Sequence, residues 1–280
     1  MHSFLYRKRQ TYVIPGFGLT MGISLTMLSL FILIPLASVL VYSLHLTGTE
    51  YLKLVTNDTI RNSFVTSISC SFLAAGITCF FGTILAWVLV RYQFKGKVIL
   101  NGLIELPFAL PTAVAGITLS KMYAPTGLIG SVFADWGIFI TYTKAGLTIA
   151  LIFVGIPYAV RSVQPVLEKF DASYEEAGIM LGASSFQIFR RIILPELRPA
   201  ILTGFGLAFA RGLGEYGSVI YIAGNSAKNH TQVLSYVIMQ KLNYIDYAGA
   251  TAIALAMLVI AFMLLLTINM IQVRQARRVQ

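Results

Sequence analysis

The sequence predicts an all-α integral membrane protein with six transmembrane helices. The 280 residues are 57% hydrophobic and only 11% charged, with a mean hydropathy of +0.77, whereas about a quarter of the residues of a soluble domain are charged. Six apolar stretches reach the length of about 20 residues that a bilayer-spanning helix needs. Basic residues also gather in the short loops beside these stretches, as they do in membrane proteins.

The length of the first span and the prolines of the third and fourth refine this prediction. The first is much longer than the roughly 7–15 apolar residues of a cleavable signal peptide, so we expect a retained helix. The third and fourth contain prolines, which spanning helices tolerate where neighbouring helices satisfy the backbone, so we expect both in the bundle interior. The predicted spans are residues 17–44, 62–90, 98–122, 145–165, 200–224 and 247–270.

The basic residues predict the orientation of the chain. Positive charge concentrates on the cytoplasmic side of membrane proteins. We therefore expect both termini and residues 91–97 and 166–199 in the cytoplasm, with Arg211 left inside the fifth span. The side predicted as cytoplasmic carries Arg7, Lys8, Arg9, Arg91, Lys95, Lys97, Arg161, Lys169, Arg190, Arg191, Arg198, Arg274, Arg277 and Arg278. The other side carries Lys53, Arg61, Lys121, Lys144, Lys228 and Lys241.

The sequence contains no recognisable catalytic constellation. It has neither a GxxxxGK[ST] phosphate-binding loop nor an HExxH metal motif, and its 3 histidines are scattered. Cys70 and Cys79 lie inside an apolar run and are predicted to be small core residues rather than a disulfide or metal site. The net charge of +10 is explained by membrane topology, so no nucleic-acid partner is expected. The sequence thus predicts a membrane protein that is not an enzyme and binds no cofactor or metal.

Residues 170–199 are too polar to span and predict two short helices. Ser173 and Glu176 have the spacing of a capping box, and Gly182 is placed to end the first helix in a left-handed conformation. A second capping box begins at Ser184, and Pro195 is expected to stop the second helix. Helices this short are marginal in water. Something must therefore pack against them.

The second short helix predicts an apolar face. Phe186, Phe189 and Ile193 share a side by their i, i+3, i+7 spacing, with Ile192 alongside. That face suits either the membrane surface and the chain's own spans or a partner protein. The residue pattern alone leaves both possibilities open.

The spacing of this polar segment resembles the EAA motif of ABC importer permeases. Glu-Ala-Gly at 176–178, a glycine four residues later and Ile-Ile-Leu-Pro at 192–195 follow the pattern EAA-x3-G-x9-I-x-LP, with Gly178 in place of the second alanine. The resemblance implies the type I ABC importer permease fold, with cytoplasmic coupling helices that dock into an ATPase subunit. The residues assigned to this docking are Glu176, Ala177, Gly178, Gly182, Ala183, Ile192, Leu194 and Pro195.

Three further stretches resemble the sulfate/thiosulfate permeases of the T type. They read LPFALPTAVAG (106–116), RSVQPVLE (161–168) and ARGLGEYGSVIYIAGN (210–225). Molybdate and tungstate permeases share part of the last pattern, but they tend to be shorter and carry a double proline where this chain has Pro111-Thr112. A molybdate/tungstate permease is the first alternative. An autonomous ion-coupled transporter is the second.

The resemblance implies a complex with defined partners. These are a second permease subunit of the W type, two ATP-binding subunits that use ATP and Mg²⁺, and a periplasmic sulfate/thiosulfate-binding protein, all around a lipid bilayer. The implied location is the bacterial inner membrane, with a plastid membrane as the alternative. The implied organisation is an N-terminal segment with the first span (1–61), an ABC type-1 transmembrane domain (62–270) and a cytoplasmic tail (271–280).

Four residues are candidates for the anion path or its gate. Arg211 and Glu215 are predicted on one face of one helix, paired, because an unpaired charge at mid-membrane costs roughly 2.5–3.5 kcal/mol. Three roles are open for the pair: attraction of a divalent anion by the arginine, a lock between helices, or a purely structural ion pair. Pro111 and Thr112 are predicted to bend the third span and to expose backbone and hydroxyl donors near the path.

Overall fold

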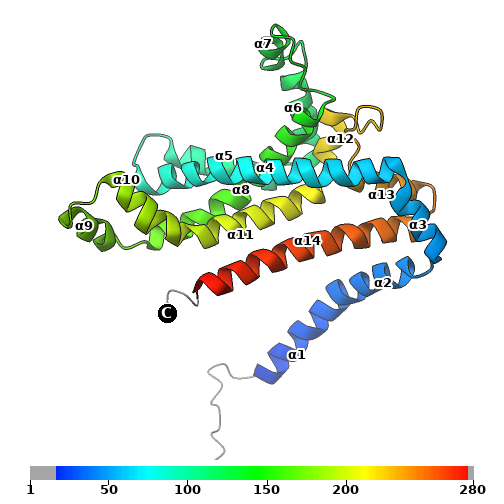
Figure 1. Cartoon of the computed structure of the whole chain (residues 1–280), viewed down its shortest axis with the longest axis horizontal. Coiled ribbons are helices and arrows are strands. Elements are labelled where there is room, and N and C mark those ends of the chain that lie inside the picture. The colour runs from blue at the N-terminus through cyan, green and yellow to red at the C-terminus, as the bar shows by residue number, and fades with distance from the viewer. Residues whose placement is uncertain (1–16, 277–280) are drawn as a thin grey trace, which may run out of the picture.

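The computed structural model describes residues 17–276, and all regular structure in that range is helical (Figure 1). Five helices are long and apolar enough to cross a membrane, and a sixth candidate span is a bent pair. The fold of a multi-span helical membrane protein is confirmed. The five are Phe17–Ser43 (α1, Phe17–Leu28; η1, Ser29–Leu33; α2, Ile34–Ser43), α4 (Asp58–Arg91), α8 (Lys144–Lys169), Ser185–Leu213 (α10, Ser185–Ile188; η2, Phe189–Ile193; α11, Leu194–Leu213) and α14 (Tyr247–Ala276).

The remaining helices are shorter and lie at the ends of the bundle or beside it. In Figure 1, α9 lies beyond one end of the long helices, α3 and α13 lie at the other end, and α6 and α7 project sideways. These helices are α3 (Gly48–Thr56), α5 (Lys97–Ala109), α6 (Thr112–Tyr123), α7 (Gly130–Ala134), α9 (Ser173–Met180), α12 (Gly217–Ala223) and α13 (Leu234–Asn243).

The centre of the bundle is formed by α4, α8 and α11, which pack on one another. Small residues let these helices approach closely, as is usual in membranes. A Cβ atom on Gly82 of α4 would lie 2.7 Å from Cβ of Ala159 on α8, and one on Gly212 of α11 would lie 3.2 Å from Oγ of Ser71 on α4. Cys70 and Cys79 are buried in this region, as predicted.

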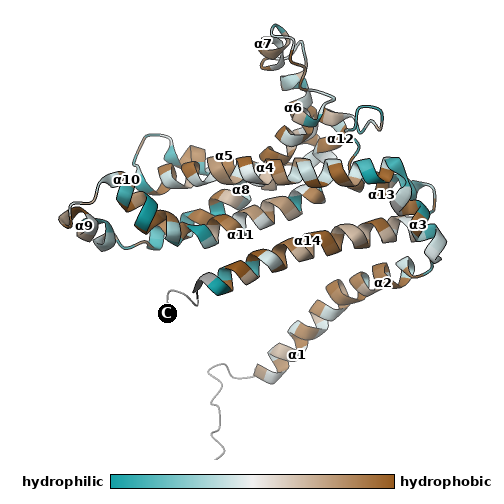
Figure 2. Cartoon of the chain, in the orientation of Figure 1, coloured by the Kyte–Doolittle hydropathy of each residue, from teal (hydrophilic) through white to brown (hydrophobic). Residues whose placement is uncertain are grey.

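The first span lies outside this core. In Figure 1, α1 and α2 run along the outside of the bundle, where α2 packs against α14. No residue of α1 or η1 is buried, and Figure 2 shows α1 and α2 hydrophobic along most of their length. A helix that is apolar all round in this position suits contact with lipid.

The predicted separation of basic residues is visible in the fold. The ends of α4, α8 and α14 that carry Arg91, Lys169 and Arg274 point towards the end of the bundle where α9 and α10 lie, whereas α3 and α13, which carry Lys53 and Lys241, lie at the opposite end (Figure 1). Figure 2 shows hydrophilic residues at both ends and hydrophobic residues between them. Arg7, Lys8, Arg9, Arg277 and Arg278 lie outside the described residues.

The third predicted span, 98–122, is not one straight helix. Residues Lys97–Ala109 and Thr112–Tyr123 form two helices bent by 114° at Leu110 and Pro111. Leu110 adopts an extended conformation, which is the conformation favoured before a proline. Pro107, in contrast, lies inside α5 without ending it.

The predicted fifth span, 200–224, is wrong at both ends. The helix runs from Ser185 to Leu213, and α12 is a separate helix. Pro195 does not stop the helix, because the wider π-helical turn Phe189–Ile193 directly precedes α11, whose second residue is Pro195, and makes room for the proline ring. The first span repeats this arrangement, with the π turn Ser29–Leu33 directly before α2, whose second residue is Pro35.

Candidate functional site

The polar segment between α8 and α11 begins with the short helix α9. Its start differs from the prediction: Ser173 is the first helical residue rather than a cap, and its backbone N–H donates to Oδ1 of Asp171 at 2.9 Å. This hydrogen bond lowers the pKa of the Asp171 carboxyl. Its end agrees with the prediction, because Gly182 has a φ of +77° and follows the last helical turn.

The turn at Gly182 presents an apolar tip to the surroundings. Met180 and Leu181 are each 88% exposed, and Ile179 is 65% exposed. Glu176 and Ala177 are also exposed, whereas Ala183 is half-buried. We refer to Ile179, Met180 and Leu181 as the apolar tip. Sequence reasoning missed them, although three consecutive apolar residues ahead of a helix-ending glycine in a polar segment were the available signal.

The second capping box is confirmed. The backbone N–H of Ser184 donates to Oε1 of Gln187 at 2.8 Å, and the backbone N–H of Gln187 donates to Oγ of Ser184 at 3.3 Å. The predicted apolar face is confirmed except at Phe186, which is exposed: Phe189, Ile192 and Ile193 belong to one core cluster, and Phe189 packs edge-on against Trp87 of α4.

Gly178 explains how the two short helices meet. It is buried, and a Cβ atom there would lie 3.1 Å from Cγ1 of Ile188 and 3.4 Å from Cδ1 of Ile192. The glycine that departs from the EAA pattern therefore sits where the space for a side chain is narrow. Of the other predicted coupling residues, Ile192 and Leu194 are half-buried, and Pro195 is exposed at the start of α11.

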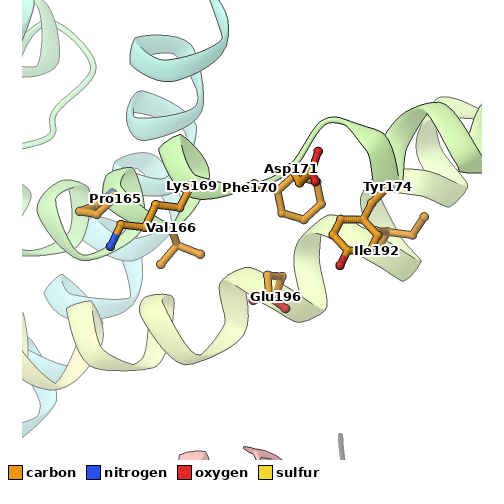
Figure 3. Close-up of a pocket in the computed structure, with 8 residues that line it drawn as sticks. All are labelled: Pro165, Val166, Lys169, Phe170, Asp171, Tyr174, Ile192 and Glu196. Carbon is orange, nitrogen blue, oxygen red and sulfur yellow. The ribbon is translucent and has the colours of Figure 1, made fainter.

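A cleft of about 750 Å³ lies beside this segment (Figure 3). Tyr174 of α9 lines it on one side, and Glu196 of α11 and Val166 of α8 line it on the others. The cleft therefore separates the start of α9 from the ends of two spanning helices. Its full lining is Pro165, Val166, Lys169, Phe170, Asp171, Tyr174, Ile192 and Glu196.

The predicted intramembrane ion pair is present but differs in its helical context. Nη1 of Arg211 lies 2.6 Å from Oε2 of Glu215. The two residues are not on one continuous helix, because α11 ends at Leu213 and Glu215 lies in the break before α12. The other carboxylate oxygen of Glu215 accepts from the backbone N–H of Ser218 at 2.8 Å and from its hydroxyl at 2.9 Å.

This break meets the break between α5 and α6. A Cβ atom on Gly217 would lie 2.2 Å from Oγ1 of Thr112, and one on Gly116 would lie 2.4 Å from the backbone oxygen of Ser218. The two predicted motifs, far apart in sequence, are thus packed together. Pro111 is exposed and Thr112 is half-buried at this junction.

Of the ion pair at this junction, the arginine and not the glutamate has hydrogen-bonding groups left for an anion. Glu215 is buried, and both of its carboxylate oxygens already have partners, Arg211 on one and Ser218 on the other. The Arg211 side chain is 31% exposed, and its single hydrogen-bonded or ionic partner among the described residues is Glu215. A guanidinium has five N–H donors, so Arg211 keeps donors that can meet an oxyanion.

Comparisons with known proteins agree with this architecture. Residues 78–280 match the family model described as "Binding-protein-dependent transport system inner membrane component". The chain is 43% identical to the sulfate transport system permease protein CysT of Salmonella typhimurium, over 95% of this chain and 96% of that protein. The corresponding protein of Escherichia coli is 42% identical over the same shares. A probable sulfate permease of Chlorella vulgaris is 44% identical over 81% of this chain and 85% of that protein.

Solved structures show the same fold at low sequence identity. A chain of a bacterial ABC transporter that imports the acidic polysaccharide alginate has a TM-score of 0.70 at 15% identity, covering 92% of this chain and 96% of its own. A chain of an inward-facing methionine ABC transporter has a TM-score of 0.58 at 15% identity, covering 79% and 97%. Identity this low supports the fold and not a substrate.

Proposed function

The chain belongs to the family of binding-protein-dependent transport system inner membrane components, and on that premise we propose that it is the permease subunit of an ATP-driven importer of sulfate and thiosulfate. The two bacterial relatives named as sulfate permeases match it almost from end to end. The carried anion is the part of the proposal that rests on these relatives. The remaining parts rest on the fold.

The apolar tip is the observation that carries the coupling role. Three exposed apolar side chains at the end of a short helix cost free energy in water, and their burial in a partner recovers it. The tip lies at the end of the bundle where Arg91, Lys169 and Arg274 gather, which supports a cytoplasmic location. We propose that this tip, with Glu176 and Ala177, enters the ATP-binding subunit.

The junction of the two helix breaks is the proposed anion path. Breaks in spanning helices are tolerated where they face protein or a water-filled cavity rather than lipid. Arg211 supplies positive charge there, and Thr112 and Pro111 lie on the facing element. Glu215 holds the arginine in place by binding it and the start of α12 at once.

The proposed complex contains a second permease subunit of the W type. A lone chain exposes the break at Leu110 and Pro111, and non-helical backbone at membrane depth needs cover from protein or water. Co-purification of two differently tagged copies of this chain would instead indicate a homodimer. Both termini are proposed to be cytoplasmic, which a fluorescent or periplasmically active reporter fused to each terminus tests directly.

Cysteine cross-linking tests the docking surface. Leu181→Cys is preferred to a cysteine at Gly182, because Gly182 has a φ of +77° that a side chain strains. The native Cys70 and Cys79 are buried, so they should not react with the cross-linker. We expect Leu181→Cys to trap the ATP-binding subunit, while Leu128→Cys, 83% exposed and beside the laterally projecting α7, traps none. Equal trapping at both positions would contradict the proposal.

Uptake by the reconstituted complex tests the substrate. We expect ATP-dependent accumulation of radiolabelled sulfate that thiosulfate competes and molybdate does not. Competition by molybdate at equal concentration would move the assignment to a molybdate/tungstate permease. Uptake without any ATPase subunit would indicate an ion-coupled transporter.

A further inference from the structure

Arg91, the last residue of α4, contacts the polar segment that follows α8. Its Nη2 makes an ion pair with Oε1 of Glu175 in α9, and both side chains are about three-quarters buried, at 24% and 27% exposure. The guanidinium carbon also lies 5.2 Å from the centre of the Trp87 ring and 5.8 Å from that of Phe170, within the range of a cation–π interaction. Arg91 is thus held by a charge and by two aromatic rings.

The same end of α4 also contacts the far side of the segment. Trp87 packs edge-on against Phe189 of η2, with 5.7 Å between the ring centres. The α4 end therefore contacts the segment before α9 at Phe170, within α9 at Glu175 and beyond α10 at Phe189. The end of one membrane-spanning helix therefore contacts the segment at three points.

Helix α9 has few other attachments. Gly178 is its one buried residue, and it packs on Ile188 and Ile192, which belong to the same polar segment. On its other side, Tyr174 borders the cleft of about 750 Å³ shown in Figure 3. Within the described residues, Glu175 makes the one ion pair that joins α9 to a spanning helix.

Helix α4 leads from this contact to the proposed anion path. It is 34 residues long without a proline, unlike α8 and α11. Ser71 lies 20 residues before Arg91, about 30 Å along the helix. A Cβ atom on Gly212 would lie 3.2 Å from Oγ of Ser71, and Gly212 is the neighbour of Arg211. Helix α4 therefore connects the Arg91 contact to the immediate neighbour of Arg211.

We infer that Arg91 is a positioning residue that transmits movement of α9 into α4 through its pair with Glu175, and through α4 to the Arg211 junction. The inference rests on the proposed function, because it takes α9 to be the part that the ATP-binding subunit moves. A merely structural Arg91 would only hold the segment folded. A transmitting Arg91 sets how much transport each hydrolysed ATP produces.

The ratio of sulfate carried to ATP hydrolysed separates these roles. The test uses the whole complex in proteoliposomes with its binding protein, and compares Arg91→Gln with Arg61→Gln. Arg61 is a matched control, because it pairs with Asp58 at the opposite end of the same helix and both side chains are exposed. We expect Arg91→Gln to lower the ratio by at least about fivefold, the lower end of usual coupling between sites, and Arg61→Gln to leave it unchanged.

Two more variants extend the test. The charge swap Arg91→Glu with Glu175→Arg restores the pair without the stacked rings, so we expect partial recovery of the ratio relative to either single substitution. If Arg91→Gln fails to assemble, Glu175→Gln decides the matter, because it removes the pair and leaves Arg91 on Trp87 and Phe170. Uptake and hydrolysis that fall in equal proportion, or a ratio that stays at the unmodified value, overturns the inference.

Failure of the inference differs from failure of the proposed function. If the unmodified complex hydrolyses ATP without carrying sulfate, the proposed substrate is wrong, and stimulation of hydrolysis by the binding protein then replaces the ratio as the readout. If the unmodified chain binds no ATPase, the proposed function and the inference are both wrong. If the unmodified complex transports normally and Arg91→Gln keeps its ratio, the inference alone is wrong.

Discussion

Glu215 and Arg211 form an ion pair of 2.6 Å whose two members differ in exposure: the glutamate side chain is 1% exposed and the arginine side chain 31%. The carboxylate is enclosed and also binds the N–H and hydroxyl of Ser218. Its backbone oxygen accepts from the Ser235 hydroxyl at 2.6 Å, which ties the break to α13. Glu215 therefore stabilises the junction, whereas the Arg211 side chain stays partly exposed.

Glu215→Ala is expected to destabilise the fold. The substitution leaves the buried N–H and hydroxyl of Ser218 without a partner, which costs about 1–3 kcal/mol. Thermal unfolding followed by a thiol-reactive dye measures this, because Cys70 and Cys79 are buried until the bundle opens. Asp58→Ala, at the exposed Arg61 pair, should leave the unfolding temperature within experimental error. Equal shifts for both variants would contradict a special role for Glu215.

Arg211→Gln is expected to lose transport while keeping the complex together. Hydrogen bonds to a charged group contribute about 1.5–3 kcal/mol, so removal of the guanidinium should lower sulfate uptake by roughly tenfold or more. Arg211→Lys keeps the charge next to Glu215 but has fewer N–H donors. Its sulfate uptake should lie between that of the unmodified protein and that of Arg211→Gln. Assembly and ATP hydrolysis provide the control measurements. Normal uptake by assembled Arg211→Gln would leave the ion pair a purely structural role.

The spans were predictable because a spanning helix needs about 20 mostly apolar residues, and an average over that length changes little when single residues are polar. The first, second, fourth and sixth predicted spans agree closely with the helices Phe17–Ser43, Asp58–Arg91, Lys144–Lys169 and Tyr247–Arg274, except at the start of the second and at the ends of the fourth and sixth. Those helices extend further because the polar residues at their ends are also helical. Hydropathy does not report such extensions.

Helix breaks were less predictable, since proline has two possible outcomes. Pro111 ends a helix and bends the chain, whereas Pro195 lies within one, because a π turn precedes it. No local pattern distinguishes these two cases. Phe189 and Ile193 pack in one core cluster, as their spacing predicts, whereas Phe186 is exposed. The contact between Thr112 and Gly217 depends on packing across 104 intervening positions, which one sequence does not reveal.

Gly116→Ala is expected to separate α6 from α12. The added Cβ would lie 2.4 Å from the backbone oxygen of Ser218, and neither backbone can yield cheaply. Overpacking of this kind costs about 1–3 kcal/mol, so both the unfolding temperature and sulfate uptake should fall. Gly102→Ala in the adjacent α5 is the matched control, because no heavy atom lies within 4 Å of its added Cβ. A normal Gly116→Ala protein would show that the junction is looser than described.

Gly178→Ala is expected to be nearly neutral, and Gly178→Val damaging. Alanine gains about 1 kcal/mol of helix propensity over glycine, which offsets a Cβ contact of 3.1 Å with the side chain of Ile188. Valine adds two methyl groups in the same narrow space and costs about 1–3 kcal/mol. Retention of the ATPase on the complex after heating reports the difference. Loss of the ATPase from both variants would mean that any side chain at this position disturbs the docking surface.

Asp246, in the turn before α14, is expected to lose its stabilising effect in acid. Its Oδ2 lies 2.6 Å from Nζ of Lys241, and its Oδ1 accepts from the backbone N–H of Gly249 at 2.8 Å. The hydrogen bond from Lys241 lowers the pKa of the Asp246 carboxyl below its usual value of 3.8. Because the folded pKa is the lower one, the stabilisation is complete above 3.8 and disappears as the pH falls through the folded pKa.

Asp246→Asn isolates this contribution. Asparagine can still accept from Gly249, as a helix N-cap does, so the variant removes chiefly the charge opposite Lys241. At neutral pH we expect a loss of up to about 1 kcal/mol, the usual value of a partly exposed pair. The difference in unfolding temperature between the two proteins should then shrink towards zero below about pH 4. A difference that grows as the pH falls would contradict the assignment, because it would require a carboxyl that is stabilised by protonation rather than by Lys241.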